Sequence, residues 1–477
     1  MNSTNHQGKK KKDTEYVVVS YFFVLIFVSL IGYLIYFNTV LKDDILSSSY
    51  NRRQNQAAET IIRGDIKSLD GETLAYTDVD SEGNETRIYP YDDLFAHAVG
   101  YMNNGKGGLE AIANYHLLTS HAFILERIQN EFLEEKNDGD TVVATLDYSL
   151  QKTAYDALGD YKGAVVVIEP STGRILSMVS KPDYDPNTLE QNWESIVNDE
   201  NSSVLVNRAT QGQYPPGSIY KIVTSLSYLR EKGRIDSYHY DCKGELTIGE
   251  HTIHCYAGTV HGNETFREAF ASSCNTSFAQ IGLELGANAL EKTSNDLLFN
   301  AKLPVELTYK KSEFQLDSTA GDATIMQTSF GQGETLVSPM HMALITCAIA
   351  NGGTLMKTYM IDHIENNNGD LVSTTKPKAY RTLMTPEEAQ VLSEMMEQVV
   401  TSGTASKLND HSYTAAGKTG SAEFYKEDGS IGTHSWFVGF SNVDQPDIVV
   451  CVLAEGAGTG SSVAVPIAEK IFNAYYD

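Results

Sequence analysis

The longest apolar segment of the chain lies near its N-terminus, from Tyr16 to Phe37. It carries no charge, and a helix of this length, at about 1.5 Å per residue, spans about 33 Å, enough to cross a bilayer. The basic run Lys9–Lys12 directly before it predicts a cytoplasmic N-terminus and an extracytoplasmic position for residues 38 onward. Because the segment is longer than the apolar core of a signal peptide and no A-x-A pattern follows it, we expect a retained single-pass anchor.

Turn signals and apolar alternation divide the remainder into two regions. From Arg63 the chain alternates in short strand-like segments, with a hairpin signal at Asp70-Gly71, and residues 116–133 are expected to be helical. A polar turn at residues 137–140 predicts a domain boundary. We therefore expect a cytoplasmic tail at 1–15, a transmembrane helix at 16–37, an N-terminal region at 38–140 and a main domain at 141–477.

The main domain has strand patterns at both ends and helical patterns between them. Residues 141–158 read as a strand followed by a helix, and residues 162–180 as two strands joined by a hairpin. Near the C-terminus, three strand-like segments precede a closing helix at 465–476; the segments are 413–424, 433–441 and 447–455. This order predicts an α/β (α+β) fold with a mixed or antiparallel sheet flanked by helices.

Composition and charge do not change the predicted fold, but they exclude two classes of protein. Of 477 residues, 41% are hydrophobic and 21% are charged, which is ordinary globular composition and excludes a largely disordered chain. The chain contains 62 acidic and 36 basic residues and has a net charge of -26. Such acidity argues against nucleic-acid binding, which normally requires a basic face.

The segment 214–233 contains the first candidate for catalysis. The apolar spacing after Pro216-Gly217 predicts an amphipathic helix that starts at Ser218 and ends before Gly233. Lys221 lies three residues after Ser218, so one helical turn places both side chains on the same face. A serine hydroxyl is a good nucleophile only when a base takes its proton, and a lysine can be that base if burial lowers its pKa. Alone, this pattern more often marks a capping serine and a solvated lysine.

Two further motifs follow in order. They are Ser273-Cys274-Asn275 and Lys418-Thr419-Gly420. Each by itself is more often structural, as a helix cap, a turn or a solvated strand-edge charge. The set Ser-x-x-Lys, Ser-x-Asn and Lys-Thr-Gly, in this order, is that of penicillin-binding proteins and class A β-lactamases. The chain therefore resembles the penicillin-binding transpeptidases.

The resemblance covers roughly residues 50–477 and favours class B members of that family. Arg63-Gly-Asp-Ile66 and residues 95–110 are similar to their non-catalytic, dimerisation-like pedestal. Residues 38–140 are too few for the glycosyltransferase domain of class A members. The resemblance thus implies a monofunctional D,D-transpeptidase with a pedestal at 38–140 and a penicillin-binding transpeptidase domain at 141–477.

The resemblance also implies a serine acyl-enzyme mechanism. The substrate would be the D-Ala-D-Ala end of a peptidoglycan stem peptide, and β-lactams would mimic it. Ser218 would attack the penultimate carbonyl, and Lys221 would take its proton. Ser273 would relay a proton to the leaving amine, while Asn275 would bind the substrate amide and Lys221.

The third motif would bind the substrate's carboxylate and its developing oxyanion. Lys418 and Thr419 would contact the terminal carboxylate. The backbone N–H groups of Ser218 and of Ser421, which follows Gly420, would form the oxyanion hole. No metal and no other cofactor is expected for this chemistry.

Other functions remain open at this point. A carboxypeptidase or β-lactamase-like hydrolase would share the acylation step but needs a base for deacylation, and Glu423 is as plausible in a structural role. A β-lactam sensor or scaffold is disfavoured, because the catalytic set is intact and the cytoplasmic tail is short. The family further implies partner proteins of a cell-wall synthesis complex.

A group of cysteines and histidines lies between the first two motifs. It comprises Cys242, His251, His254, Cys255 and His261, with Cys274 inside the second motif. Zinc would need four nitrogen or sulfur ligands, but the spacing is not a standard zinc pattern. A Cys242–Cys255 disulfide or free thiols are favoured, with the histidines on the surface and Cys274 in a packing role. Cys347 and Cys451 lie in apolar runs and are expected in the core.

Overall fold

The computed structural model describes residues 7–37, 59–425 and 429–477. The chain divides into two compact units, residues 1–60 and 61–477. In the first, α1 (Gln7–Tyr36) contains a stretch, Thr14–Tyr36, that is long and apolar enough to cross a membrane. This stretch coincides with the predicted anchor to within two residues at each end.

A five-stranded sheet forms the core of the second unit. Its order is β17-β18-β19-β7-β8, and every neighbouring pair is antiparallel. The strands are β7 (Gly163–Ile168), β8 (Ile175–Lys181), β17 (Ala415–Tyr425), β18 (Ile431–Ser441) and β19 (Val449–Ala454). The two predicted groups of strands, far apart in sequence, therefore meet where β19 pairs with β7, and β17 forms a free edge.

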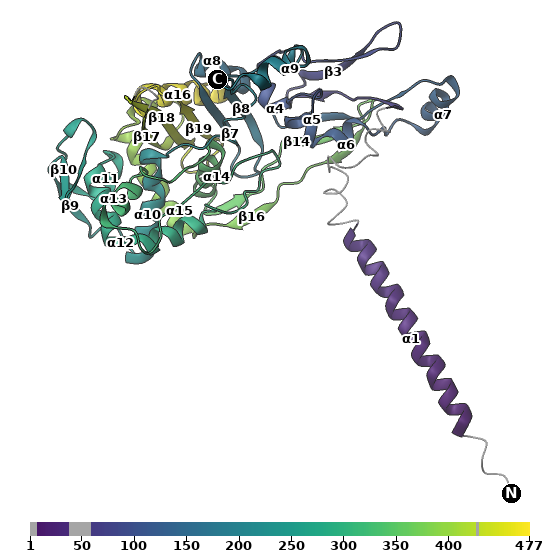
Figure 1. The fold of residues 1–477 in the computed structure, drawn as a ribbon, viewed down its shortest axis with the longest axis horizontal. Coiled ribbons are helices and arrows are strands. Elements are labelled where there is room, and N and C mark those ends of the chain that lie inside the picture. Colours follow the sequence, from purple (N-terminus) through teal and green to yellow (C-terminus); the bar gives the residue numbers. More distant parts are fainter. Residues whose placement is uncertain (1–6, 38–58, 426–428) are drawn as a thin grey trace. The chain divides into compact units, whose positions relative to one another are not determined.

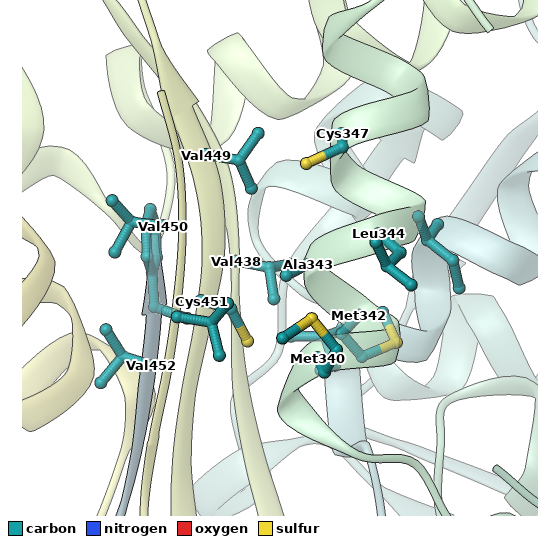
Figure 2. Packing of buried hydrophobic residues seen from close by; sticks show 14 of the residues in the cluster. Met340, Met342, Ala343, Leu344, Cys347, Val438, Val449, Val450, Cys451 and Val452 are labelled. Carbon is teal, nitrogen blue, oxygen red and sulfur yellow. The ribbon is translucent and has the colours of Figure 1, made fainter. Parts of the chain in front are cut away.

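Helices cover both faces of this sheet (Figure 1). On one face lie α8 (Tyr148–Leu158) and the C-terminal α16 (Val465–Tyr476), and on the other lies α14 (Pro339–Ala350). Figure 2 shows Met340, Ala343 and Cys347 of α14 beside Val438, Val449 and Cys451 of the sheet, while Val450 and Val452 lie on the opposite side of the strand. Because both faces are covered, every residue of β19 is buried rather than every second one. The predicted core positions of Cys347 and Cys451 are confirmed.

A helical layer continues beyond the free edge of β17. α15 (Pro386–Thr401) packs against β17, and α10 (Lys221–Lys232) packs against α12 (Asn275–Asp296). The other helices of this layer are α11 (Phe266–Ala271) and α13 (Asp322–Ser329), and two small antiparallel ribbons adjoin it: β9 (His239–Cys242) with β12 (Gly262–Thr265), and β10 (Glu245–Ile248) with β11 (His251–His254).

A second sheet joins strands from both predicted regions. Its order is β15-β14-β6-β2-β3-β4. β2 (Ile66–Lys67), β3 (Thr73–Val79) and β4 (Glu85–Ile88) precede residue 140, whereas β6 (Thr141–Ala144), β14 (Ile361–Glu365) and β15 (Leu371–Thr374) follow it. β6 pairs in parallel with β2 and antiparallel with β14, so the sheet continues across the predicted boundary.

The predicted helix over residues 116–133 is instead two helices. α6 (Asn114–Leu117) ends early, and α7 (Ile124–Leu133) begins after an extended connection. That connection is held by Asp140, whose N–H donates to Thr119 O (2.8 Å) and whose Oδ1 accepts from His121 N (2.9 Å).

The remaining elements are β1 (Ile61–Ile62), α4 (Ala96–Val99), α5 (Gly108–Ile112), β5 (Asn137–Asp138), α9 (Leu189–Asn198), η2 (Gly217–Tyr220), η3 (Tyr256–Gly258), β13 (Thr354–Met356), β16 (Ala379–Thr382), η4 (Ser406–Leu408) and η5 (Gly460–Ala464).

A buried ionic network holds the N-terminal elements together. Glu110 is fully buried and accepts hydrogen bonds from Arg63 Nε (2.6 Å) and Arg87 Nε (2.8 Å). Burial alone would raise the pKa of Glu110, but the two guanidinium groups lower it below its usual value. The charge of Glu110 is therefore compensated inside the fold by Arg63, which follows β1, and by Arg87 of β4.

Candidate active site

The three sequence motifs converge on one cleft beside the free edge of β17. The cleft has a volume of 1260 Å³. It is lined by Ser218, Ser273, Asn275, Thr419 and Ser421, among others. The two lysines of the motifs are fully buried. Residues as far apart in the sequence as Ser218 and Ser421 are thus gathered at a single site.

The nucleophile candidate lies at the start of a helix that is fixed by close backbone contacts. The predicted helix begins as the 3₁₀ turn η2, continues as α10 and ends at Gly233, which has a left-handed conformation. Gly217 N–H donates to Gly331 O at 2.9 Å. A Cβ atom on Gly331 would lie 1.9 Å from Gly217 O, so only glycine permits this approach. The turn carrying Ser218 is therefore anchored by the connection between α13 and α14.

The same turn packs directly on the edge strand. A Cβ atom on Gly420 would lie 3.0 Å from Trp436 Cβ and 3.1 Å from Ile219 Cγ2. The Trp436 indole Nε1–H donates to Pro215 O at 3.2 Å. The small residue in Lys-Thr-Gly thus lets η2 approach β17, which brings Ser218 beside the third motif.

Lys221 is held by the second motif. Its Nζ donates to Ser273 O (2.7 Å), Ser273 Oγ (3.1 Å) and Asn275 Oδ1 (2.8 Å). Ser273 has a φ of 60°, an uncommon value for a residue with a side chain. This backbone conformation is supported by the Lys221 hydrogen bond to the Ser273 carbonyl. The second motif thus binds the lysine of the first motif with three oxygen atoms.

Lys418 approaches the same serine from the sheet. Its Nζ donates to Ser273 Oγ (3.0 Å) and to Thr419 O (3.2 Å). A hydroxyl oxygen accepts two hydrogen bonds and donates one. With both lysines as donors, the Ser273 hydroxyl proton is free to point to a third group in the cleft.

Burial determines the electrostatics of both lysines. Desolvation lowers the pKa of Lys221 to about 8. Desolvation, and then the positive charge of Lys221, lower the pKa of Lys418 well below its usual value. Two adjacent ammonium groups in a buried site repel each other, so a neutral amine is accessible near neutral pH. This is the condition under which a lysine can act as a base.

Thr404 is a residue of the cleft that was not identified from the sequence. Thr404, in the loop after α15, lines the cleft, and its Oγ1 lies 2.6 Å from Thr419 Oγ1. Gly403 permits this, because a Cβ atom there would lie 2.4 Å from Ala271 O. The short, small-residue stretch 402–405 was the only available sequence signal. It is too common to indicate a site by itself.

Of the two favoured alternatives for Cys242 and Cys255, a disulfide or free thiols, the described structure has free thiols. Cys242 Sγ and Cys255 Sγ lie 3.7 Å apart as free thiols. Cys274, expected only to pack, lies 3.7 Å from Cys255 Sγ. His251 and His254 are exposed as expected, whereas His261 is half-buried with its Nδ1 3.4 Å from Cys242 Sγ.

Comparisons with known proteins agree with this geometry. Residues 163–473 match the family described as penicillin binding protein transpeptidase domain, and residues 63–142 match the penicillin binding protein A dimerisation domain. The chain is 30% identical over 434 residues to the peptidoglycan D,D-transpeptidase PbpA of Mycolicibacterium smegmatis, covering 85% of this chain and 87% of the relative. It is 26% identical over 452 residues to MrdA, a peptidoglycan D,D-transpeptidase of Acinetobacter baumannii, and the alignment covers 82% of this chain and 66% of that relative.

Solved structures show the same similarity. The penicillin G acyl-enzyme complex of penicillin-binding protein A from M. tuberculosis aligns with a TM-score of 0.78 and 28% identity. The alignment covers 88% of this chain and 100% of that one.

Proposed function

The chain belongs to the penicillin-binding protein transpeptidase family, and on that premise we infer that it is a class B, monofunctional peptidoglycan D,D-transpeptidase. It cross-links stem peptides through a serine acyl-enzyme and is acylated by β-lactams. One observation carries the residue assignment: Ser273 Oγ accepts hydrogen bonds from Lys221 and Lys418 in a cleft that Ser218 lines.

Acylation begins at Ser218 in this proposal. Its Oγ attacks the carbonyl of the penultimate D-Ala, and neutral Lys221 takes its proton. Lys221 is suited to this because burial lowers its pKa, and because its neutral amine keeps two N–H groups to donate to oxygens of the Ser273–Asn275 segment and a lone pair for the Ser218 proton. The tetrahedral oxyanion is stabilised by the backbone N–H groups of Ser218 and Ser421, and one such donor is typically worth about 2.7–4 kcal/mol.

The leaving amine receives its proton through Ser273. Because the Ser273 hydroxyl accepts from both lysines, its own proton can be donated into the cleft and replaced from Lys221. The terminal D-Ala then departs. An amine of a second stem peptide attacks the acyl-enzyme, and the same groups run the proton transfers in reverse.

Substrate binding is assigned to the third motif and to Asn275. Lys418 supplies positive charge towards the terminal carboxylate, and the Thr419 hydroxyl donates to it. Gly420 lets the substrate backbone lie along the free edge of β17 as an added strand. Asn275 Oδ1 orients Lys221, and its amide group binds the substrate peptide.

Location and partners follow from the same assignment. One N-terminal helix is suited to span a membrane once. In this proposal the N-terminus is cytoplasmic and the catalytic unit lies outside, where peptidoglycan is assembled; the basic residues at 9–12 support this orientation. Residues 38–140 form the non-catalytic pedestal and 141–477 the catalytic domain. The pedestal and anchor engage partner proteins of a cell-wall synthesis complex.

Intact mass measurement of the full-length protein in detergent tests the assignment. Benzylpenicillin is expected to add its own mass to the wild type and to the control Ser227→Ala, which loses another buried hydroxyl of α10. Ser218→Ala is expected to remain unmodified. A rapidly lost adduct with penicillin turnover would identify a hydrolase instead. Release of D-Ala with formation of a cross-linked dimer from stem peptides tests the transfer step directly.

A further inference from the structure

The helix α7 (Ile124–Leu133) turns its apolar side away from the protein. None of its ten residues is buried, and only Glu126 and Asn130 are half-buried. Glu126 Oε1 accepts a hydrogen bond from Asn367 Nδ2 at 2.6 Å, and Asn130 Nδ2 donates to Asn137 Oδ1 at 3.1 Å. An amphipathic helix on a globular protein normally packs its apolar side on the core instead. The polar side thus attaches α7, and the apolar side is left for a contact outside the fold.

The uncovered side of α7 is strongly apolar. Ile124, Ile128 and Phe132 follow one another at a spacing of four residues, so their side chains lie along one side of the helix. The exposed fraction of Phe132 reaches 85%. The exposed apolar residues of this segment are Phe123, Ile124, Leu125, Ile128, Phe132 and Leu133. A surface that meets only water seldom presents so many large apolar side chains together, so this face indicates a binding surface.

A strand pair connects α7 to the point where the chain arrives from its apolar N-terminal helix. β5 (Asn137–Asp138) follows α7 after residues 134–136 and pairs in parallel with β1 (Ile61–Ile62). β1 is the first strand after α1, and residues 37–60 connect the two. At about 3.3–3.6 Å per extended residue, this connection cannot exceed about 85 Å. α7 therefore adjoins the part of the unit that the anchor keeps within reach of a membrane.

The tether and the charge of the segment favour lipid as the occupant of this face. A single short helix binds a bilayer weakly, but a tethered one binds intramolecularly, at an effective concentration set by the length of the tether. The segment is acidic, so attraction to anionic head groups cannot drive its binding, and the apolar side chains must. The charged residues of 124–136 are four acidic and two basic: Glu126, Glu131, Glu134, Glu135, Arg127 and Lys136.

We propose that α7 is an interfacial membrane helix. Its apolar side enters the boundary between head groups and acyl chains of the bilayer that α1 spans, and its polar side holds the unit formed by residues 61–477. Figure 1 shows α7 at one end of this unit and β9 and β10 at the other, so the cleft stays outside the lipid. The inference rests on the proposed membrane anchor and is independent of the catalytic residues.

Fluorescence of the full-length protein in phosphatidylcholine vesicles tests the proposal. The chain has two tryptophans, Trp193 and Trp436, so subtraction of the wild type gives the emission added by Phe132→Trp. This emission is expected to be quenched in vesicles whose acyl chains are brominated near the head groups, and to be shifted to shorter wavelength in unbrominated ones. Val197→Trp is the matched control, because Val197 is an exposed apolar residue of another helix, α9. Its emission is expected to be the same in both kinds of vesicle.

Substitutions on the two sides of α7 identify the side chains that insert. In the Phe132→Trp protein, Ile124→Gln together with Ile128→Gln is expected to abolish the quenching, whereas Arg127→Gln on the polar side is expected to retain it. The three residues are exposed, so thermal unfolding is expected to be unchanged. Phosphatidylglycerol in the vesicles is expected to leave the quenching unchanged, because the segment is acidic.

Several outcomes would overturn the proposal. Equal emission of Phe132→Trp in both kinds of vesicle would show that α7 does not enter lipid. A shift to shorter wavelength without quenching, growing with the protein-to-lipid ratio, would assign the face to a second copy of the chain. Quenching that survives Ile124→Gln with Ile128→Gln, or that needs phosphatidylglycerol, would exclude apolar insertion, and equal quenching in Val197→Trp would assign the contact to the whole unit. Flotation with the vesicles checks the anchor, whose failure would remove the premise, and the benzylpenicillin adduct on the same preparation reports separately on the catalytic assignment.

Discussion

Lys221 and Lys418 donate hydrogen bonds to the same atom, Ser273 Oγ, at 3.1 and 3.0 Å. Lys221 belongs to the helix that continues from the turn carrying Ser218, and Lys418 belongs to the edge strand β17, which borders the cleft. Their shared acceptor makes the second motif the connection between the proposed base, Lys221, and the proposed carboxylate-binding group, Lys418. The protonation state of either amine therefore affects the other through one hydroxyl.

Acylation is expected to depend on pH through Lys221. Burial lowers its pKa to about 8, and only the neutral amine can accept the Ser218 proton. The acylation rate with benzylpenicillin should therefore rise with pH, reach half of its maximum near pH 8 and level off above it. Quenched-flow measurement of the full-length protein between pH 6 and 10 checks this. A rate that falls as the pH rises through this range would contradict Lys221 as the base.

Removing the hydroxyl of Thr404 is expected to weaken catalysis modestly. Thr404→Val loses the hydrogen bond to Thr419 Oγ1 but keeps the side-chain shape. A neutral hydrogen bond is worth about 0.5–1.5 kcal/mol, which corresponds to a loss of about 2–12-fold in the second-order acylation rate. Thr404→Ser keeps the hydroxyl and should retain most of the rate. Equal rates for wild type and Thr404→Val would show that Thr419 is oriented without this contact.

A methyl group at Gly331 is expected to displace η2, the turn that carries Ser218. In Gly331→Ala, the new Cβ would lie 1.9 Å from Gly217 O, so η2 must move. Gly333→Ala is the matched control, because Gly333 also has a positive φ (88°) but its Cβ would meet only Thr328 Oγ1, at 3.7 Å. We expect penicillin acylation to fall at least about 100-fold in the first variant only, since a 1 Å misplacement can cost that much. Similar losses in both would assign the effect to backbone strain.

Neutralising Glu110 is expected to destabilise the N-terminal elements of the unit formed by residues 61–477. Glu110→Gln leaves Arg63 and Arg87 buried without their shared carboxylate, which typically costs about 3–5 kcal/mol of unfolding free energy. Asp156→Asn removes the partner of Lys152 in an exposed i,i+4 pair and should cause no measurable change. Denaturant titration of both variants in detergent measures the difference. A small loss in Glu110→Gln would mean that the two arginines find other partners.

The sequence predicted the parts of the site that depend on local spacing. The prediction of a helix that starts at Ser218 and ends before Gly233 is confirmed, because its apolar period and flanking glycines are local signals. The strands predicted near the two ends of the main domain are also confirmed, since their alternating or continuously apolar patterns are short-range signals. The convergence of the three motifs was expected from the family resemblance, not from the pattern of residues.

Features that depend on contacts between distant segments could not be predicted. Thr404 reaches the cleft only because α15 packs on β17, which no residue near Thr404 indicates. Cys242, Cys255 and Cys274 come from separate elements, so their spacing in the sequence did not indicate that their sulfurs would be neighbours. The non-helical conformation of residues 118–123 depends on Asp140, so the prediction of one continuous helix from the local pattern was wrong.

The sheet that joins β6 to β14 also sets an order of events during folding. β2, β3, β4 and β6 are synthesised more than two hundred residues before β14, their neighbour in the sheet. Until residues 361–365 are available, β6 presents an unpaired edge, and such edges promote association between chains. The pedestal strands are thus completed only late in synthesis. A chain truncated before β14 would retain the membrane helix and the first strands, but its half-finished sheet would be prone to aggregation.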